Sequence, residues 1–130
     1  MPRPKSSQPT DVELQILQIL WDIGPCGVGK IHERLKALKG TNYSTTVKML
    51  AVMREKNLVK RNESATPHVY RAAVTRERAQ KRMLRNLISR AYDGSAMSLV
   101  LHALSSEKAS SAEIKDIENI IARMKQETDQ

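Results

Sequence analysis

The chain has 130 residues, which allows one domain, or one small domain with an appendage. Its formal net charge of +8 at pH 7 points to a polyanionic partner, nucleic acid before membrane. A single cysteine excludes an internal disulfide and a cysteine-rich zinc site, and no apolar run approaches the ~20 residues that cross a bilayer.

The first 74 residues predict a flexible tail followed by a helical scaffold. Residues 1–9 hold three of the five prolines and no apolar core of a signal peptide, so we expect a flexible arm in a cytoplasmic protein. The sequence Thr10-Asp11-Val12-Glu13 is a capping box that predicts a helix ending at Gly24-Pro25. A second helix is expected from Val28 to Leu38, with apolar residues at spacings of three and four.

The next segment predicts a helix that enters a DNA groove. Ser44 is the expected N-cap, and Asn57 is the expected stop because asparagine tolerates the left-handed conformation. One face of the helix is predicted to be buried and the other to be small and partly cationic. The buried stripe comprises Thr46, Met49, Leu50 and Met53, and the outer face comprises Ser44, Val47, Lys48, Ala51 and Glu55.

A basic β-hairpin is predicted directly after this helix. Residues 58–61 and 68–72 form the expected strands, joined by a polar, turn-rich loop. From Lys48 to Arg61 there are five Lys or Arg against one Glu, placed where phosphates would be met. We favour a phosphate contact for Arg61. For Arg71, strand alternation could equally place the side chain in solvent.

Residues 75–130 predict three more amphipathic helices. The first, from about Thr75 to Tyr92, begins with a nearly all-polar half that we interpret as a spacer leaving the winged domain. The others are expected from Ser95 to Leu104 and after a second capping box that begins at Ser110. Fifty-five residues rarely enclose a core of their own, so we expect this unit to interlock with its copy in a second subunit. The expected dimerisation residues are Leu84, Leu87, Ile88, Val100, Leu101, Leu104, Ile114, Ile117, Ile120 and Ile121.

The charge also changes sign along the chain. Residues 1–74 have a net charge of +6 and residues 76–90 of +5, whereas residues 93–130 have −3. The last third is therefore expected to face something other than phosphate. No catalytic motif is present, and His32, His68 and His102 have no neighbours at metal-ligand spacing, so we expect no enzyme, no metal and no cofactor.

The sequence resembles the penicillinase-repressor family, the BlaI/MecI-type winged-helix repressors of bacteria, which includes copper-responsive CopY-type members. The match runs from Thr10 to about Met124. Four stretches carry it: Pro9-Thr10-Asp11-Val12-Glu13-Leu14 through Leu20-Trp21; Tyr43-Ser44-Thr45 with Lys48 and Leu50; Glu55-Lys56-Asn57-Leu58-Val59; and Gly94-Ser95-Ala96 with Leu99-Val100-Leu101-His102-Ala103-Leu104.

The resemblance implies repression of resistance or stress genes by a homodimer on operator DNA. Ser44, Thr45 and Lys48 would lie in the major groove, and the hairpin from Arg61 to His68 would be the wing. A regulatory protease or a membrane sensor is left as an open alternative for a further partner. The protein itself is not expected to insert into a membrane. The β-lactam-responsive members are cut at an Asn-Phe bond where this chain reads His102-Ala103, and the copper-responsive members end in a CxC motif that this chain lacks.

We therefore predict a mainly α protein: a winged helix-turn-helix of three helices and a small β-hairpin in residues 10–74, followed by a three-helix dimerisation unit in residues 75–130. Its expected function is transcriptional repression as a homodimer on a palindromic operator. The alternatives are a winged-helix adaptor for protein contacts without DNA binding, and a sensor with a small-molecule site between the fourth and fifth helices. The predicted DNA-binding residues are Ser44, Thr45, Lys48, Arg54, Lys60, Arg61 and His68.

Overall fold

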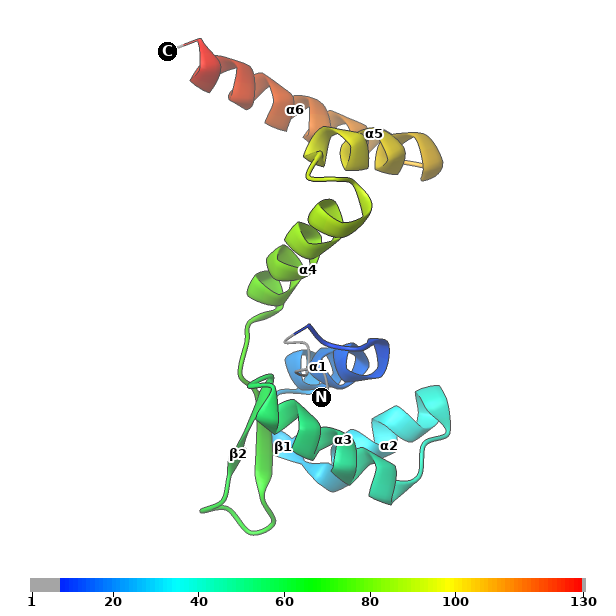
Figure 1. The fold of residues 1–130 in the computed structure, drawn as a ribbon, viewed down its shortest axis with the longest axis vertical. Coiled ribbons are helices and arrows are strands. Elements are labelled where there is room, and N and C mark those ends of the chain that lie inside the picture. The colour runs from blue at the N-terminus through cyan, green and yellow to red at the C-terminus, as the bar shows by residue number, and fades with distance from the viewer. Residues whose placement is uncertain (1–7, 130) are drawn as a thin grey trace. The chain divides into compact units, whose positions relative to one another are not determined.

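The computed structural model describes residues 8–129, so most of the predicted N-terminal arm lies outside the described residues. Over this range the chain is mainly helical, with six helices and a small antiparallel sheet of three strands (Figure 1), which confirms the predicted fold class. The elements are α1 (Asp11–Ile23), β1 (Cys26–Gly27), α2 (Val28–Lys39), α3 (Tyr43–Glu55), β2 (Val59–Asn62), β3 (Val69–Ala72), α4 (Arg76–Ala91), α5 (Ala96–Ser106) and α6 (Ser111–Thr128).

The chain divides into two compact units, one up to Leu84 and the other from Arg85 onward, so α4 contributes to both. The division into functional domains at residue 74 remains a prediction. No helix within residues 8–129 combines the length and the apolar character that crossing a membrane requires.

The first unit encloses one aliphatic core built by α1, α2, α3 and the sheet. The capping box predicted at Thr10 starts α1: the Thr10 hydroxyl accepts from the Glu13 N–H at 3.2 Å, and the Glu13 carboxylate accepts from the Thr10 N–H at 2.8 Å. Burial of apolar side chains in this core is the main stabilising contribution to the unit. The core residues are Ile16, Leu17, Ile19, Leu20, Ile31, Leu35, Leu50, Met53, Leu58, Val59 and Tyr70.

Two left-handed residues set the path of the chain around α3. Gly40 ends α2 with φ of 65°, a conformation that costs glycine little because it lacks a Cβ. Asn57 follows α3 with φ of 61°, which confirms the predicted stop. The tight turn at Gly40 brings α3 back beside α2 (Figure 1). Of the apolar residues at helical spacing in α2, Ile31 and Leu35 are buried, whereas Leu38 is 61% exposed.

The sheet has the strand order β1-β3-β2. The predicted hairpin is present, with Val59 opposite Ala72 at its base and Asn62 opposite Val69 near its tip. The two-residue strand β1 was not predicted, because Cys26 and Gly27 are too short a segment for an alternating pattern. Its pairing with β3 anchors the hairpin to the segment between α1 and α2.

The second unit has no comparable core. α4 ends at Ala91, and Asp93 and Gly94 shortly after it both have positive φ. The predicted second capping box is present at Ser110 and Glu113. The hydrogen bond that the Ser110 N–H donates to the Glu113 carboxylate lowers the pKa of Glu113, and the Ser110 side chain adds to this effect. Neither α5 nor α6 contains a buried residue.

Candidate nucleic-acid interface

The start of α3 is fixed by Asn42. Its side-chain Oδ1 accepts hydrogen bonds from the Thr45 N–H at 2.9 Å and from the Ser44 hydroxyl at 3.0 Å. The N-cap is therefore Asn42, and the prediction that Ser44 is the cap is wrong. Asparagine and serine are both good caps, and which one takes this role depends on where the turn after Gly40 lets helical geometry begin.

The two faces of α3 separate as the periodicity predicts. Thr46, Leu50 and Met53 are buried, and Met49 is partly buried against the core. The outward residues, including the predicted groove residues, are exposed. These are Ser44, Thr45, Val47, Lys48 and Ala51.

His32 of α2 stabilises the first turn of α3. Its Nδ1 lies 2.9 Å from the hydroxyl oxygen of the fully buried Thr46, and that hydroxyl in turn donates to the Asn42 carbonyl at 3.4 Å. The His32 ring also packs edge-on against Tyr43, with ring centroids 5.4 Å apart. These contacts give His32 a structural role, because they hold the end of α3 that would enter a groove.

Lys56, counted among the bases predicted to meet phosphate, is buried instead. Its Nζ lies 2.6 Å from Glu13 Oε1 and 2.8 Å from the Gln8 carbonyl oxygen. Burial raises the pKa of Glu13, but the hydrogen bonds from Lys56 and the Thr10 backbone outweigh it and bring that pKa below its ordinary value. The sequence count of local positive charge therefore overstates what faces outward.

The wing carries both cations and an acid that partly neutralises them. The Arg61 Nε donates to Glu63 Oε1 at 3.2 Å, and Arg54 Nη2 lies 3.6 Å from the same oxygen. The hydrogen bond from Arg61 lowers the pKa of Glu63, and the same bond raises the pKa of Arg61. Of the remaining predicted wing residues, Lys60 and His68 are exposed. The structure thus brings Arg54, Arg61 and Glu63 together, an association that spacing alone did not reveal.

The first half of α4 packs on α1, so its interpretation as a spacer is wrong. Ala79 is only 8% exposed, Arg76 lies over the Trp21 ring with its guanidinium carbon 5.6 Å from the ring centroid, and Arg76 Nη2 is 2.7 Å from Asp22 Oδ1. The Trp21 Nε1 also donates to the Val74 carbonyl at 3.0 Å. In the sequence, this contact with α1 is indicated only by one small residue, Ala79, within an otherwise polar run.

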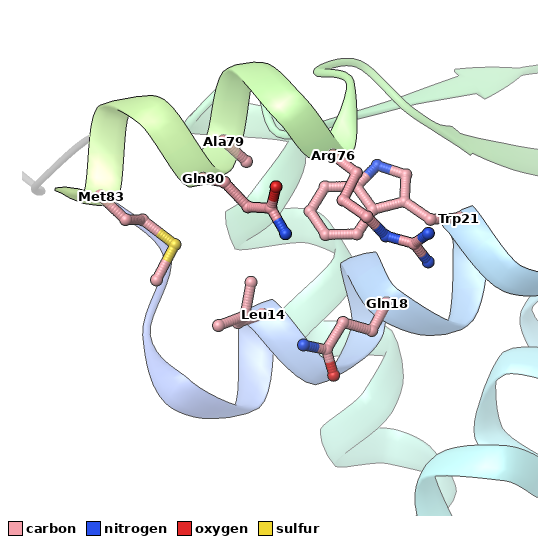
Figure 2. Close-up of a pocket in the computed structure, with 7 residues that line it drawn as sticks. All are labelled: Leu14, Gln18, Trp21, Arg76, Ala79, Gln80 and Met83. Atoms are coloured by element: carbon pink, nitrogen blue, oxygen red, sulfur yellow. The ribbon is translucent and has the colours of Figure 1, made fainter. Parts of the chain in front are cut away.

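A small open pocket remains at this contact, and Figure 2 shows the side chains around it. Its volume is about 230 Å³, below the roughly 300 Å³ at which small-molecule pockets begin, and its polar groups are exposed amides and a guanidinium that is already paired. We therefore interpret the pocket as the space left between two packed helices, α1 and α4, and not as a small-molecule site. Its lining residues are Leu14, Gln18, Trp21, Arg76, Ala79, Gln80 and Met83.

No group of three His, Cys, Asp or Glu side chains that could hold a metal ion occurs in residues 8–129. Burial raises the pKa of the Cys26 thiol, and the nearby Lys30 only partly offsets this effect. A raised pKa disfavours the reactive thiolate, as expected for an unreactive cysteine. His102 lies near Tyr92, with ring centroids 5.6 Å apart, within the second unit.

The helix pair α2 and α3, joined by a tight turn and followed by the hairpin, defines a winged-helix module of the DNA-binding kind. The family model described as penicillinase repressor matches residues 9–123, and the chain belongs to that family. It is accordingly a DNA-binding transcriptional repressor by family and a non-enzymatic regulator. This membership argues against the alternative of an adaptor without DNA binding. No curated protein matches the sequence.

Proposed function

We propose that this protein represses transcription in the cytoplasm as a homodimer bound to a palindromic operator. In each subunit α3 would enter a major groove, with Ser44, Thr45 and Lys48 at base edges. The support is that all three side chains are exposed on the first two turns of a helix whose other face is buried. The N-terminal residues of a recognition helix are the ones that reach bases in helix-turn-helix proteins.

The outer face of α3 suits a groove that contains thymine. Val47 is 41% exposed, and Ala51 on the same face is also exposed. Small apolar side chains make favourable contacts with the thymine methyl group, which lies in the major groove. Exposed apolar side chains on this face would also suit the adaptor alternative, but DNA contact accounts for them without a protein partner.

The main support for a homodimer is that α5 and α6 contain no buried residue, although both helices have an apolar face. The predicted dimerisation residues in these helices are mostly half-exposed, from 44% for Val100 to 59% for Leu101, and Ile117 is partly buried. Full burial of one such side chain contributes about 1.5 to 3 kcal/mol. A second copy of the same helices would cover these faces without any further partner.

A dimer of this kind determines the form of the DNA site. Two identical subunits related by a two-fold axis present two identical α3 helices, so the two half-sites must also be related by a two-fold axis. The half-sites would be one helical turn apart, ~34 to 36 Å, or a multiple of it. This is the basis for proposing a palindromic operator.

The mode of induction is proposed to differ from that of the β-lactam-responsive members. At the place of their Asn-Phe bond, α5 holds His102 and Ala103, so we propose that repression here is not relieved by cleavage at this position. A regulatory protease or membrane sensor would then have to act elsewhere on the chain. Mass spectrometry showing a cut between His102 and Ala103 in induced cells would contradict this proposal.

The test is a pair of measurements on the full chain. Footprinting across its own upstream region should protect a two-fold symmetric sequence, and sedimentation equilibrium should give twice the 14.7 kDa subunit mass. A monomer that binds no duplex at any ionic strength would refute the proposal. A dimer that protects only an asymmetric site would refute the palindromic operator alone.

A further inference from the structure

The contact between α1 and the first half of α4, here called the α1–α4 contact, is held by weak interactions. The Trp21 Nε1 donates to the Val74 carbonyl at 3.0 Å, Arg76 lies over the Trp21 ring, and Arg76 Nη2 is 2.7 Å from Asp22 Oδ1. The side chains of Arg76 and Asp22 are 51% and 65% exposed, so their ion pair adds little stability. The aliphatic core contains no residue of α4 as the structure describes it. The α1–α4 contact can therefore open without unfolding that core.

α4 carries two stripes of side chains that face in different directions. The stripe that borders the space beside α1 (Figure 2) consists of Arg76, Ala79, Gln80 and Met83. The second stripe consists of the predicted dimerisation residues Leu84, Leu87 and Ile88. At 3.6 residues per turn, the eight positions from Arg76 to Leu84 rotate the second stripe by about 80° from the first. Because α4 is one unbroken helix of 16 residues, the two stripes keep this relation to each other.

We propose that the α1–α4 contact determines which half-site spacing the dimer accepts, an inference that rests on the proposed function. In the proposed homodimer Leu84, Leu87 and Ile88 join α4 to the second subunit. A winged-helix unit that is fixed to α4 then presents α3 over a narrow range of distances. With the contact open, the unit is connected to α4 only through residues 73–75. Trp21 and Arg76 are thus positioning residues for spacing specificity.

The physical reason lies in how the second half-site is bound. After one α3 has entered its groove, the other binds at an effective concentration that depends on the length and stiffness of the connection between them. A stiff connection favours one spacing strongly, whereas a flexible one tolerates several. Two inserted base pairs also rotate the second half-site around the duplex by about 70°, because one turn takes ~10.5 base pairs. A unit fixed to α4 cannot follow that rotation.

The test opens the α1–α4 contact in the full chain. Arg76→Gln removes the ion pair and the ring contact, and Ala79→Glu places an acid at a position that is 8% exposed between the helices. Arg78→Gln is the matched control, because it changes the net charge by the same amount at an exposed position in the same turn. Trp21 is the single tryptophan of the chain, so its fluorescence reports independently whether the contact has opened.

Affinity is measured for the footprinted operator, for the same operator with two base pairs inserted between the half-sites, and for an isolated half-site. The insertion should weaken binding of wild type and Arg78→Gln by at least about tenfold. It should weaken binding of Ala79→Glu by less than about threefold, with Arg76→Gln between these values. The emission of Trp21 should shift to the red in Ala79→Glu, since the ring gains solvent. Affinity for the isolated half-site should equal that of Arg78→Gln.

The result that overturns the inference is a changed Trp21 emission in Ala79→Glu together with the spacing preference of wild type. Unchanged emission would show that α4 does not rest on Trp21, and would refute it as well. An equal loss of affinity for every duplex, the isolated half-site included, would mean that the substitution damages the winged-helix unit and does not act through spacing. A wild-type dimer that binds DNA without any spacing preference refutes this inference alone, whereas a wild type that binds no DNA refutes the proposed function.

Discussion

Replacing Lys56 by methionine would remove the cation of a buried ion pair while keeping a side chain of similar length. Lys56 and Glu13 have side chains only 7% and 5% exposed, and their charged atoms are 2.6 Å apart. Removing one partner of such a pair costs roughly 3 to 5 kcal/mol, because the other charge stays buried without compensation. The Thr10 N–H still donates to Glu13, so we expect the lower end of this range.

The expected loss is large enough to measure by thermal unfolding. For a unit of this size each kcal/mol shifts the melting temperature by about 4 to 8 °C, so Lys56→Met should lower it by at least about 12 °C. The matched control is the double variant Glu13→Gln and Lys56→Met, which keeps an acceptor for the Thr10 N–H and leaves no buried charge. It should recover most of the loss, and protein concentration must be held constant because dimerisation also stabilises.

The pH dependence gives the reasoning a second check. The pKa of Glu13 is lowered on folding, so its contribution to stability is present above the pKa of the unfolded chain and is lost as the pH falls through the lowered folded value. Without Lys56, burial would dominate and raise that pKa. The deficit of Lys56→Met should therefore shrink as the pH falls into the acidic range where Glu13 is protonated in both proteins.

Urea unfolding of wild type and variant at neutral and acidic pH measures this difference. A free energy of unfolding for Lys56→Met within about 0.5 kcal/mol of wild type at neutral pH would refute the reasoning, since that is the range of ordinary surface substitutions. A deficit that stays the same on acidification would show that the loss comes from packing and not from the uncompensated carboxylate.

Other substitutions test the interface and the assembly. Lys48→Ala should weaken operator binding by roughly 1 to 3 kcal/mol, and an equal loss on random DNA in the same titration would make it a phosphate contact. Glu63→Gln should tighten binding to any duplex and steepen its salt dependence, because it frees two arginines from an acid; unchanged affinity would show that these arginines do not meet phosphate. Ile117→Asp should dissociate the dimer in sedimentation, whereas Ala122→Asp on the polar face of α6 should not; a dimer in both would remove this face from the interface. Asn42→Ala should cost about 1 kcal/mol of stability by circular dichroism, and no loss would assign the cap elsewhere.

The sequence by itself determined the local order of this protein. Both capping boxes, the buried stripe of α3 and the stop at Asn57 follow from residues within one or two helical turns of each other, and the structure confirms each of them. The winged-helix class follows from their order along the chain. These features are readable because their partners are close in sequence.

Only the tertiary structure decided which charges face outward. Lys56 meets Glu13 across 43 positions of sequence, Arg76 meets Asp22 across 54, and the strand register sets Lys60 against Arg71. Residue type and periodicity contain no information on such distant partners, so a count of bases treated all of them alike. Whether a lysine is an internal counter-ion or a free cation depends on the group that folding places beside it.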